Sequence, residues 1–170
     1  MRRFVGLVAL LLTGLPVPAQ EVSLENRVKA SYLYNFVKYV EWPPSARTGP
    51  ITLCIAGRNP FGTVLDEILR DETVDGRTLT SRIILEPEAG CHVLFIPDGS
   101  AAAVYLRAAR GTPTLTVGET SDFLARGGII SLVTEGRYVR FAISAEAAEQ
   151  AQLQVSSRLL QLAINTRGSR

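Results

Sequence analysis

The sequence predicts an α/β protein in which helices cover both faces of a mixed, mostly parallel sheet, as a three-layer sandwich with helices at both ends of the chain. Short apolar segments rich in β-branched residues alternate with segments of helical periodicity. Most of these apolar segments are continuous, as expected for strands buried on both faces. Near the C-terminus, two of them flank residues 134–137, whose turn glycine predicts a β-hairpin and therefore some antiparallel pairing.

The longest predicted helix covers residues 24–40. Ser23 can cap its N-terminus, and Glu25 lies in the first turn, where the helix dipole favours a negative charge. Apolar residues recur every four positions, and Trp42 ends the helix because a residue before proline avoids the helical region. Other helices are predicted at 61–69, 121–125, 145–150 and 156–164, and an alanine-rich one opens at 97–100 and ends near 109.

Six strands are predicted, at 51–56, 82–85, 91–96, 114–117, 129–133 and 138–143, with a turn at Asp75-Gly76. No internal repeat or low-complexity linker divides the chain, and its length fits one domain. We therefore expect a single domain over residues 20–170.

Residues 1–19 are predicted to be a cleaved secretory signal peptide. Arg2 and Arg3 precede an apolar run, and small residues lead to a cut after Ala19. The alternative is a retained membrane anchor, but the run falls short of the roughly 20 residues that cross a bilayer. The mature protein is therefore expected to be exported.

The charge balance argues against a nucleic-acid or membrane-surface partner. Without Arg2 and Arg3, the 18 basic residues fall to 16, equal to the 16 acidic ones. A neutral chain with scattered arginines lacks the basic patch that binds phosphate backbones or anionic lipids.

The sequence offers little catalytic chemistry. Its single histidine, His92, directly follows Cys91, and neighbouring strand residues point to opposite faces of a sheet. An ordinary structural hydrogen bond is the simpler interpretation of His92. One histidine and two cysteines do not supply the ligands that zinc requires, so no metal, cofactor or enzymatic activity is predicted.

The segment 57–62 follows a buried strand and opens a helix, where doubly wound folds bind phosphates. Its two terminal glycines are followed by Thr63-Val64, so the lysine of nucleotide-binding loops is missing. Both a plain turn and a small-ligand site remain open for this segment.

Cys54 and Cys91 both lie in the mature part of the chain. In an oxidising compartment an even number of cysteines favours a disulfide, which at this separation would stabilise the fold by roughly 4 kcal/mol. Two buried free thiols are the alternative, since cysteine packs well as a small apolar residue.

Five candidate partner- or ligand-binding residues stand out: Tyr34, Glu41, Trp42, Arg137 and Arg140. The two aromatic ones belong to a cluster that one helix face cannot bury entirely, and such residues are favoured at interfaces. The alternative is that both cover the core of the domain itself. Arg140 should face away from Val139 and Phe141 and could clamp an anion, or it could be salt-bridged.

Several segments together resemble the YfiR-like family of periplasmic proteins. The resemblance begins with the helix and turn spelled KASYLYNFVKYVEWP from Lys29 to Pro43, and it covers about residues 27–163. It continues through NPFG from Asn59, CHVLFI from Cys91, LTV from Leu115, GGII from Gly127, VRF from Val139 and SSRLL from Ser156.

The resemblance implies a regulator that binds the periplasmic region of a membrane diguanylate cyclase, lowers cyclic di-GMP and restrains biofilm formation. It also implies a homodimeric α/β protein, an outer-membrane lipoprotein as a possible further partner, and a Cys54–Cys91 bridge. A second cysteine pair found in the best-known member is missing here, so a redox switch built on that pair is not expected. Because related proteins are linked to histidine kinases, the alternative is a small-molecule sensor coupled to such a kinase or another receptor.

Overall fold

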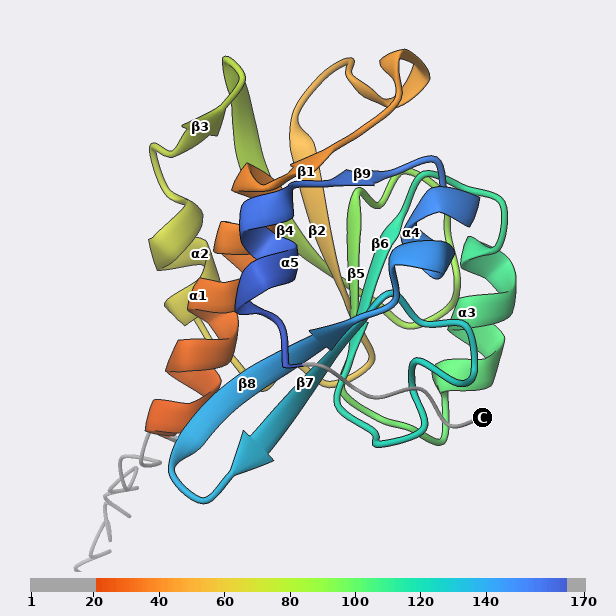
Figure 1. Ribbon diagram of the computed structural model, residues 1–170. Coiled ribbons are helices and arrows are strands. Elements are labelled where there is room, and N and C mark those ends of the chain that lie inside the picture. The colour runs from red at the N-terminus through yellow and green to blue at the C-terminus, as the bar shows by residue number, and fades with distance from the viewer. Residues whose placement is uncertain (1–20, 165–170) are drawn as a thin grey trace, which may run out of the picture.

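The computed structural model describes residues 21–164, and its centre is a seven-stranded sheet with the order β3-β4-β2-β5-β6-β7-β8 (Figure 1). Strands β4, β2, β5, β6 and β7 run parallel, while β3 and β8 are antiparallel to their neighbours. The strands are β2 (Ile51–Ala56), β3 (Thr73–Val74), β4 (Arg77–Ile84), β5 (Val93–Ile96), β6 (Leu115–Gly118), β7 (Ile130–Glu135) and β8 (Tyr138–Ile143). The predicted α/β class with a mixed, mostly parallel sheet is confirmed.

The described helices are α1 (Leu24–Lys38), the 3-10 helix η1 (Pro44–Ala46), α2 (Val64–Leu69), α3 (Ala102–Ala109), α4 (Ala145–Gln150) and α5 (Ser157–Leu162). None of the helices within residues 21–164 is both long and apolar enough to cross a membrane. The predicted signal peptide at 1–19 lies outside the described residues.

Helix α1 begins as predicted, with the Ser23 hydroxyl accepting from the Asn26 amide. It ends at Lys38, so the predicted end at residue 40 is wrong. The next two residues form β1 (Val40–Glu41), which pairs with β9 (Gln154–Val155) near the C-terminus. This tertiary pairing takes the backbone groups that a longer helix would have used.

Alternate residues of β2 enter two separate core clusters. Leu53 and Ile55 belong to the larger cluster, which also contains buried residues of α1 and α2. Cys54 and Ala56 belong to the smaller cluster, to which α3 alone among the described helices contributes. Because strand neighbours point to opposite faces, the clusters lie on the two sides of the sheet. They support the three-layer arrangement, which stays a prediction.

The connection from β4 to β5 contains no helix. These parallel strands flank β2, so the chain must cross β2 to start β5, and such crossovers usually take a dozen or more residues. Here residues 85–92 suffice. We call residues 85–91 the strap. Cys91 at its end joins the smaller cluster, so the strap lies on the α3 side of the sheet.

Strand β4 and the segment 121–125 also differ from the prediction. Strand β4 begins at Arg77 and not near residue 82, because the turn at Asp75-Gly76 pairs its start with β3. The predicted helix 121–125 is wrong: this segment forms turns. Phe123 is buried there against two glycines, where any Cβ atom would collide with its ring, and so few residues are a poor helix nucleus.

Candidate functional site

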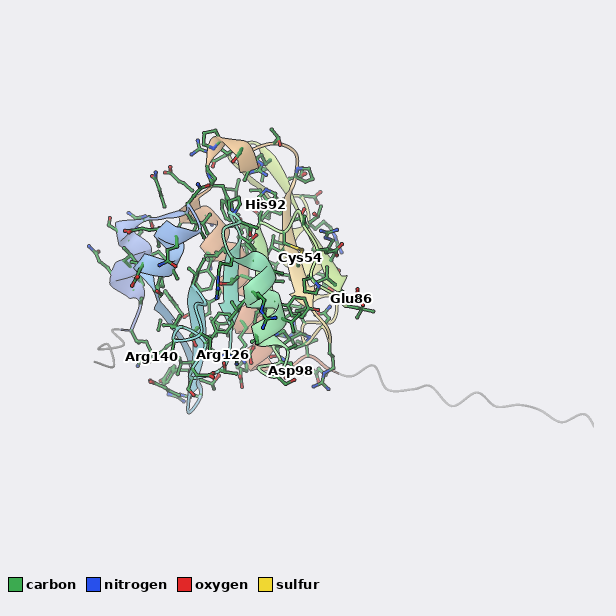
Figure 2. All side chains as sticks on the ribbon, turned by 90° about the vertical axis from the view of Figure 1, so that its right-hand side faces the viewer. Cys54, Glu86, His92, Asp98, Arg126 and Arg140 are labelled. Atoms are coloured by element: carbon green, nitrogen blue, oxygen red, sulfur yellow. A yellow bond between two sulfur atoms is a disulfide. The ribbon has the colours of Figure 1, made fainter. Side chains whose placement is uncertain are left out.

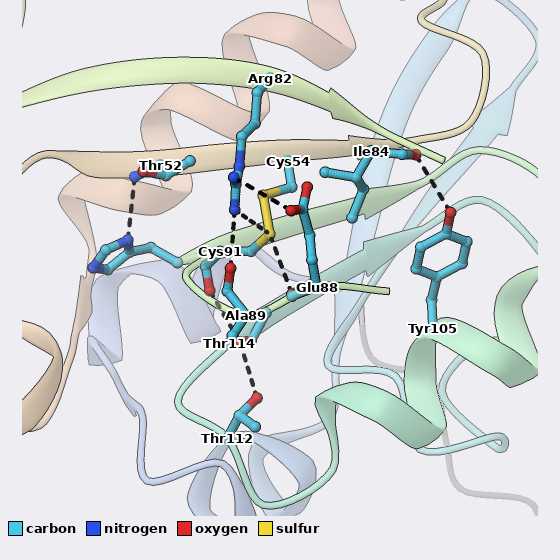
Figure 3. The surroundings of a disulfide bond; sticks show 11 residues. Thr52, Cys54, Arg82, Ile84, Glu88, Ala89, Cys91, Tyr105, Thr112 and Thr114 are labelled. Atoms are coloured by element: carbon cyan, nitrogen blue, oxygen red, sulfur yellow. Dashed lines mark hydrogen bonds and ion pairs between the residues drawn. A yellow bond between two sulfur atoms is a disulfide. The ribbon is translucent and has the colours of Figure 1, made fainter. Parts of the chain in front are cut away.

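The cysteine pair forms a disulfide under the strap, which resolves the choice left open by the sequence. Cys54 from the middle of β2 is bonded to Cys91, with their Cα atoms 5.7 Å apart (Figure 3). Both side chains are buried. The bond therefore ties the end of the strap to the face of β2 that it crosses.

Arg82 of β4 provides a second anchor for the strap (Figure 3). Its guanidinium donates to the Ala89 carbonyl at 2.9 Å and lies 3.5 Å from the Glu88 carboxylate. Within the described residues, no amide of residues 85–91 donates to another backbone group. The strap is thus held by the disulfide and by side-chain hydrogen bonds from Arg82 and Thr114, not by a hydrogen-bonded ladder.

His92 connects the start of β5 to the loop before β2. Its Nδ1 accepts from the Thr52 amide at 3.1 Å, and its Nε2 lies 3.0 Å from the Ala46 carbonyl. Burial lowers the pKa of His92, and the nearby Arg77 guanidinium lowers it further, against the opposing effect of the Ala46 carbonyl. Because Nδ1 accepts from Thr52, the neutral ring carries its hydrogen on Nε2 and donates to Ala46; the Nη2 donor of Arg77 lies 2.8 Å from the same nitrogen. His92 is therefore structural, as the simpler interpretation held.

Trp42 lies in the larger core cluster and is only 4% exposed. Its ring packs edge-on to His92, with centroids 6.0 Å apart, and the Arg47 side chain donates to its carbonyl at 2.6 Å. Its Nε1 has no hydrogen-bond partner among the described atoms. The structure therefore places the Trp42 ring in the core, and a role in partner binding stays a prediction.

Tyr34 and Glu41 lie at separate places on the surface. The half-buried Tyr34 donates its hydroxyl to Glu72 at 2.5 Å, which raises the pKa of Tyr34, and Lys38 lies 4.8 Å above its ring. Glu41 is exposed and 3.8 Å from Arg47. Neither residue contacts the disulfide.

Arg137 and Arg140 belong to the β7–β8 hairpin. Arg140 faces away from the buried Val139 and Phe141, as predicted, and its Nε lies 3.1 Å from the Glu135 carboxylate. Arg137 lies in the turn, with its guanidinium 5.2 Å from the ring of Tyr138. The turn is at the opposite end of the molecule from β1, so the five candidate residues do not form one site (Figure 1).

A buried ion cluster at Lys29 escaped the sequence analysis. Lys29 is 5% exposed, and its ammonium lies 2.6 Å from Glu25 and 2.9 Å from Glu119. Burial alone would lower the pKa of Lys29, but the hydrogen bonds to the two carboxylates outweigh it and raise the pKa. The four-residue spacing of Glu25 and Lys29 could have indicated the first pair. Glu119 comes close only through the fold.

The 57–62 segment borders a cavity of about 510 Å³ at the carboxyl ends of β2, β5 and β6. The Asn59 side chain accepts from the Phe61 amide at 2.8 Å and donates to the Gly62 carbonyl at 2.9 Å. Its polar groups are therefore used within the turn. Helix α2 begins only at Val64, so no helix N-terminus points into the segment. These contacts favour the plain turn.

A larger cavity, about 600 Å³, lies between the strap and α3. Ile84 and Leu94 line it from the sheet, and Cys91 and Tyr105 line it from the strap and the helix. The Tyr105 hydroxyl donates to the Ile84 carbonyl at 3.3 Å (Figure 3). Figure 2 views the molecule from the α3 side, with Cys54 and His92 labelled. No pattern in the sequence indicates this cavity.

No group of three or more metal-ligating side chains occurs within residues 21–164. Comparison with family models gives a match over residues 26–164 to the family described as YfiR/HmsC-like, which spans most of the chain. This is the range over which the opening aromatic helix, the disulfide and the terminal hairpin follow one another in the structure. The chain therefore belongs to the YfiR/HmsC-like family, whose members are periplasmic regulators of diguanylate cyclases rather than enzymes themselves.

Proposed function

We propose that this protein binds the periplasmic region of a membrane diguanylate cyclase and lowers its activity, so that cyclic di-GMP falls and biofilm formation is restrained. The observation that carries this proposal is the family match over residues 26–164. It concerns nearly the whole described domain, not a short motif shared by unrelated proteins.

The disulfide supports a periplasmic location. Disulfides persist in oxidising compartments and are rare in the cytosol, and the Cys54–Cys91 bond is buried in the fold. Export through cleavage after Ala19 would bring the domain to that compartment. There it would meet the outer segments of membrane signalling proteins.

The exposed face of the β7–β8 hairpin is the surface that best fits a protein partner. Tyr138 is 55% exposed, and Arg137 and Arg140 flank it on the same hairpin. Tyrosine and arginine are enriched among residues that dominate binding energy. The acidic Glu135 nearby is already paired with Arg140, so the face is mixed in charge and not strongly basic.

The test combines gene deletion with matched variants. Deletion should raise cyclic di-GMP, and wild-type protein should restore the low level. The double variant Arg137→Ala/Arg140→Ala should restore the low cyclic di-GMP level poorly, because losing two interface residues costs about 30-fold or more in affinity. The pair Arg107→Ala and Arg110→Ala, on α3 and its end, removes the same charges from another surface and should behave as wild type.

Unchanged cyclic di-GMP on deletion would overturn the proposal. If both double variants repress equally well, the hairpin face is not the interface, but the proposed function itself would still stand. Sedimentation of the purified protein tests the homodimer. Pull-down from detergent-solubilised membranes, followed by mass spectrometry, tests the cyclase and a possible outer-membrane lipoprotein as partners.

The second candidate is a small-molecule sensor coupled to a histidine kinase or another receptor. The observation that favours it is the 600 Å³ cavity, a volume in the range of ligand pockets. Recovery of a kinase and no cyclase in the pull-down, together with unchanged cyclic di-GMP, would favour this function over the first.

A further inference from the structure

We propose that the cavity between the strap and α3 is a binding site for a small, mainly apolar molecule that is uncharged or positively charged. The site is distinct from the hairpin face and from the 57–62 turn. The inference goes beyond cyclase repression and does not depend on the identity of the partner.

The cavity exists because the strap replaces a helix. In an α/β sheet, a crossover helix usually covers the strand that it passes. Here the extended strap crosses β2, and α3 is the only described helix that contributes to the cluster on this face. Several of the α3 and strap residues that face the cavity are small, among them Ala108, Ala109 and Gly90. The space between the two elements therefore stays open.

The polar side chains that line the cavity are mostly paired within the protein. Thr114 donates to the Cys91 carbonyl at 3.0 Å, and Thr112 donates to the Ala109 carbonyl at 2.7 Å. Both ring nitrogens of His92 have partners, and Tyr105 donates to the sheet. A ligand would thus meet a largely apolar lining with few free polar groups, which selects against strongly polar molecules.

The charged residues of the lining determine which ligand charge the cavity prefers. Of the lining residues that the structure describes, Glu88 is the one carboxylate, and no lysine or arginine is among them. The Glu88 side chain is 46% exposed, so a cationic ligand can reach it, in competition with Arg82 at 3.5 Å. An anion would find no lysine or arginine in the lining to pair with.

The disulfide preorganises the binding site. It fixes the strap end at Cys91, which is itself part of the cavity wall. A wall that is already in place spares the ligand the entropic cost of ordering a loop on binding.

Three probes that share one ring test the inference: 2-naphthylmethanol, 2-naphthylmethylamine and 2-naphthoate, each at about 1 mM. Saturation-transfer NMR on the oxidised protein should show binding of the alcohol and the amine and little of the carboxylate. Glu88→Gln should weaken the amine by about two- to fivefold, as expected for one exposed ion pair, and leave the alcohol unchanged.

Ala108→Trp should abolish binding of all three probes by filling the cavity from an exposed helix position. Ala103→Trp puts the same side chain at an exposed position of α3 outside the lining, and should bind as wild type. Circular dichroism checks that both variants fold. The inference is overturned if no probe binds, if the carboxylate binds as tightly as the amine, or if the two tryptophan variants behave alike.

Discussion

Removing the Cys54–Cys91 disulfide should destabilise the protein by about 4 kcal/mol. The bond closes a loop with a sequence separation of 37, and the chain-entropy relation for loops of this length gives a value of that order. Because 1 kcal/mol shifts the Tm of a domain of this size by about 2–4 °C, the expected loss is about 8–16 °C. The double variant Cys54→Ala/Cys91→Ala is the cleanest perturbation, since it leaves no buried thiol.

Urea unfolding of the oxidised wild type and the double variant measures the difference in the free energy of unfolding. The m value of the double variant should be larger, because its unfolded chain lacks the cross-link and exposes more surface. Free-thiol titration of the unreduced wild type should find none, since both cysteines are bonded. As a control, the free energy of unfolding of the reduced wild-type protein should be close to that of the double variant. If the double variant lies within about 1 kcal/mol of oxidised wild type, the loop-closure reasoning is refuted.

The same variant should expose the strap to proteolysis. A glutamyl endopeptidase can cut after Glu88, whereas Pro87 protects the bond after Glu86. With the disulfide gone, the strap is held only by the hydrogen bonds from Arg82 and Thr114 and by its packing, so cleavage after Glu88 should accelerate. Equal cleavage rates would show that the disulfide does not restrain the strap.

The remaining predictions concern three buried side chains. Burial lowers the pKa of His92, so stability should be full above the unfolded value of 6.5 and decline as the pH falls below it; denaturant unfolding from pH 7.5 to 5.5 should show this, and His92→Gln should flatten the profile. Lys29→Met should cost about 1–3 kcal/mol, because two carboxylates lose their partner, while Lys38→Met on the exposed side of the same helix should stay within about 0.5 kcal/mol; equal losses would contradict the buried ion cluster. Trp42→Ala should lose about 3–5 kcal/mol of unfolding free energy, whereas Trp42→Phe should cost clearly less because the Nε1 group makes no hydrogen bond with the described residues; a larger effect on partner binding than on thermal unfolding would restore an interface role for this residue.

Much of the local structure follows from patterns in the sequence. The four-residue periodicity and the Ser23 cap place α1, because each depends on residues a few positions apart. The continuous apolar run places β2, and the turn glycine at 136 places the β7–β8 hairpin. For Cys54 and Cys91 the sequence leaves two alternatives open, a disulfide or two buried free thiols. The proximity of β2 and the strap end decides for the disulfide.

The local patterns failed where distant segments compete for the same groups. Residues 121–125 have helical spacing but form turns around Phe123, and β1 replaces the last turn of α1 because β9 offers its backbone a partner. The meeting of Lys29 with Glu119 and the cavity under the strap have no local signal. Both depend on which strands become neighbours, and that order is set by the packing of the whole sheet.

The sequence by itself thus determined the class of fold, most of its elements and a resemblance to one family, because these depend on periodicity, turn chemistry and residue order. Only the tertiary structure decided that Trp42 lies in the core, that Arg140 is paired with Glu135 and that the strap leaves an open cavity. The physical reason is that burial and pairing are properties of contacts between segments far apart in the chain, and these contacts exist only once the sheet has assembled.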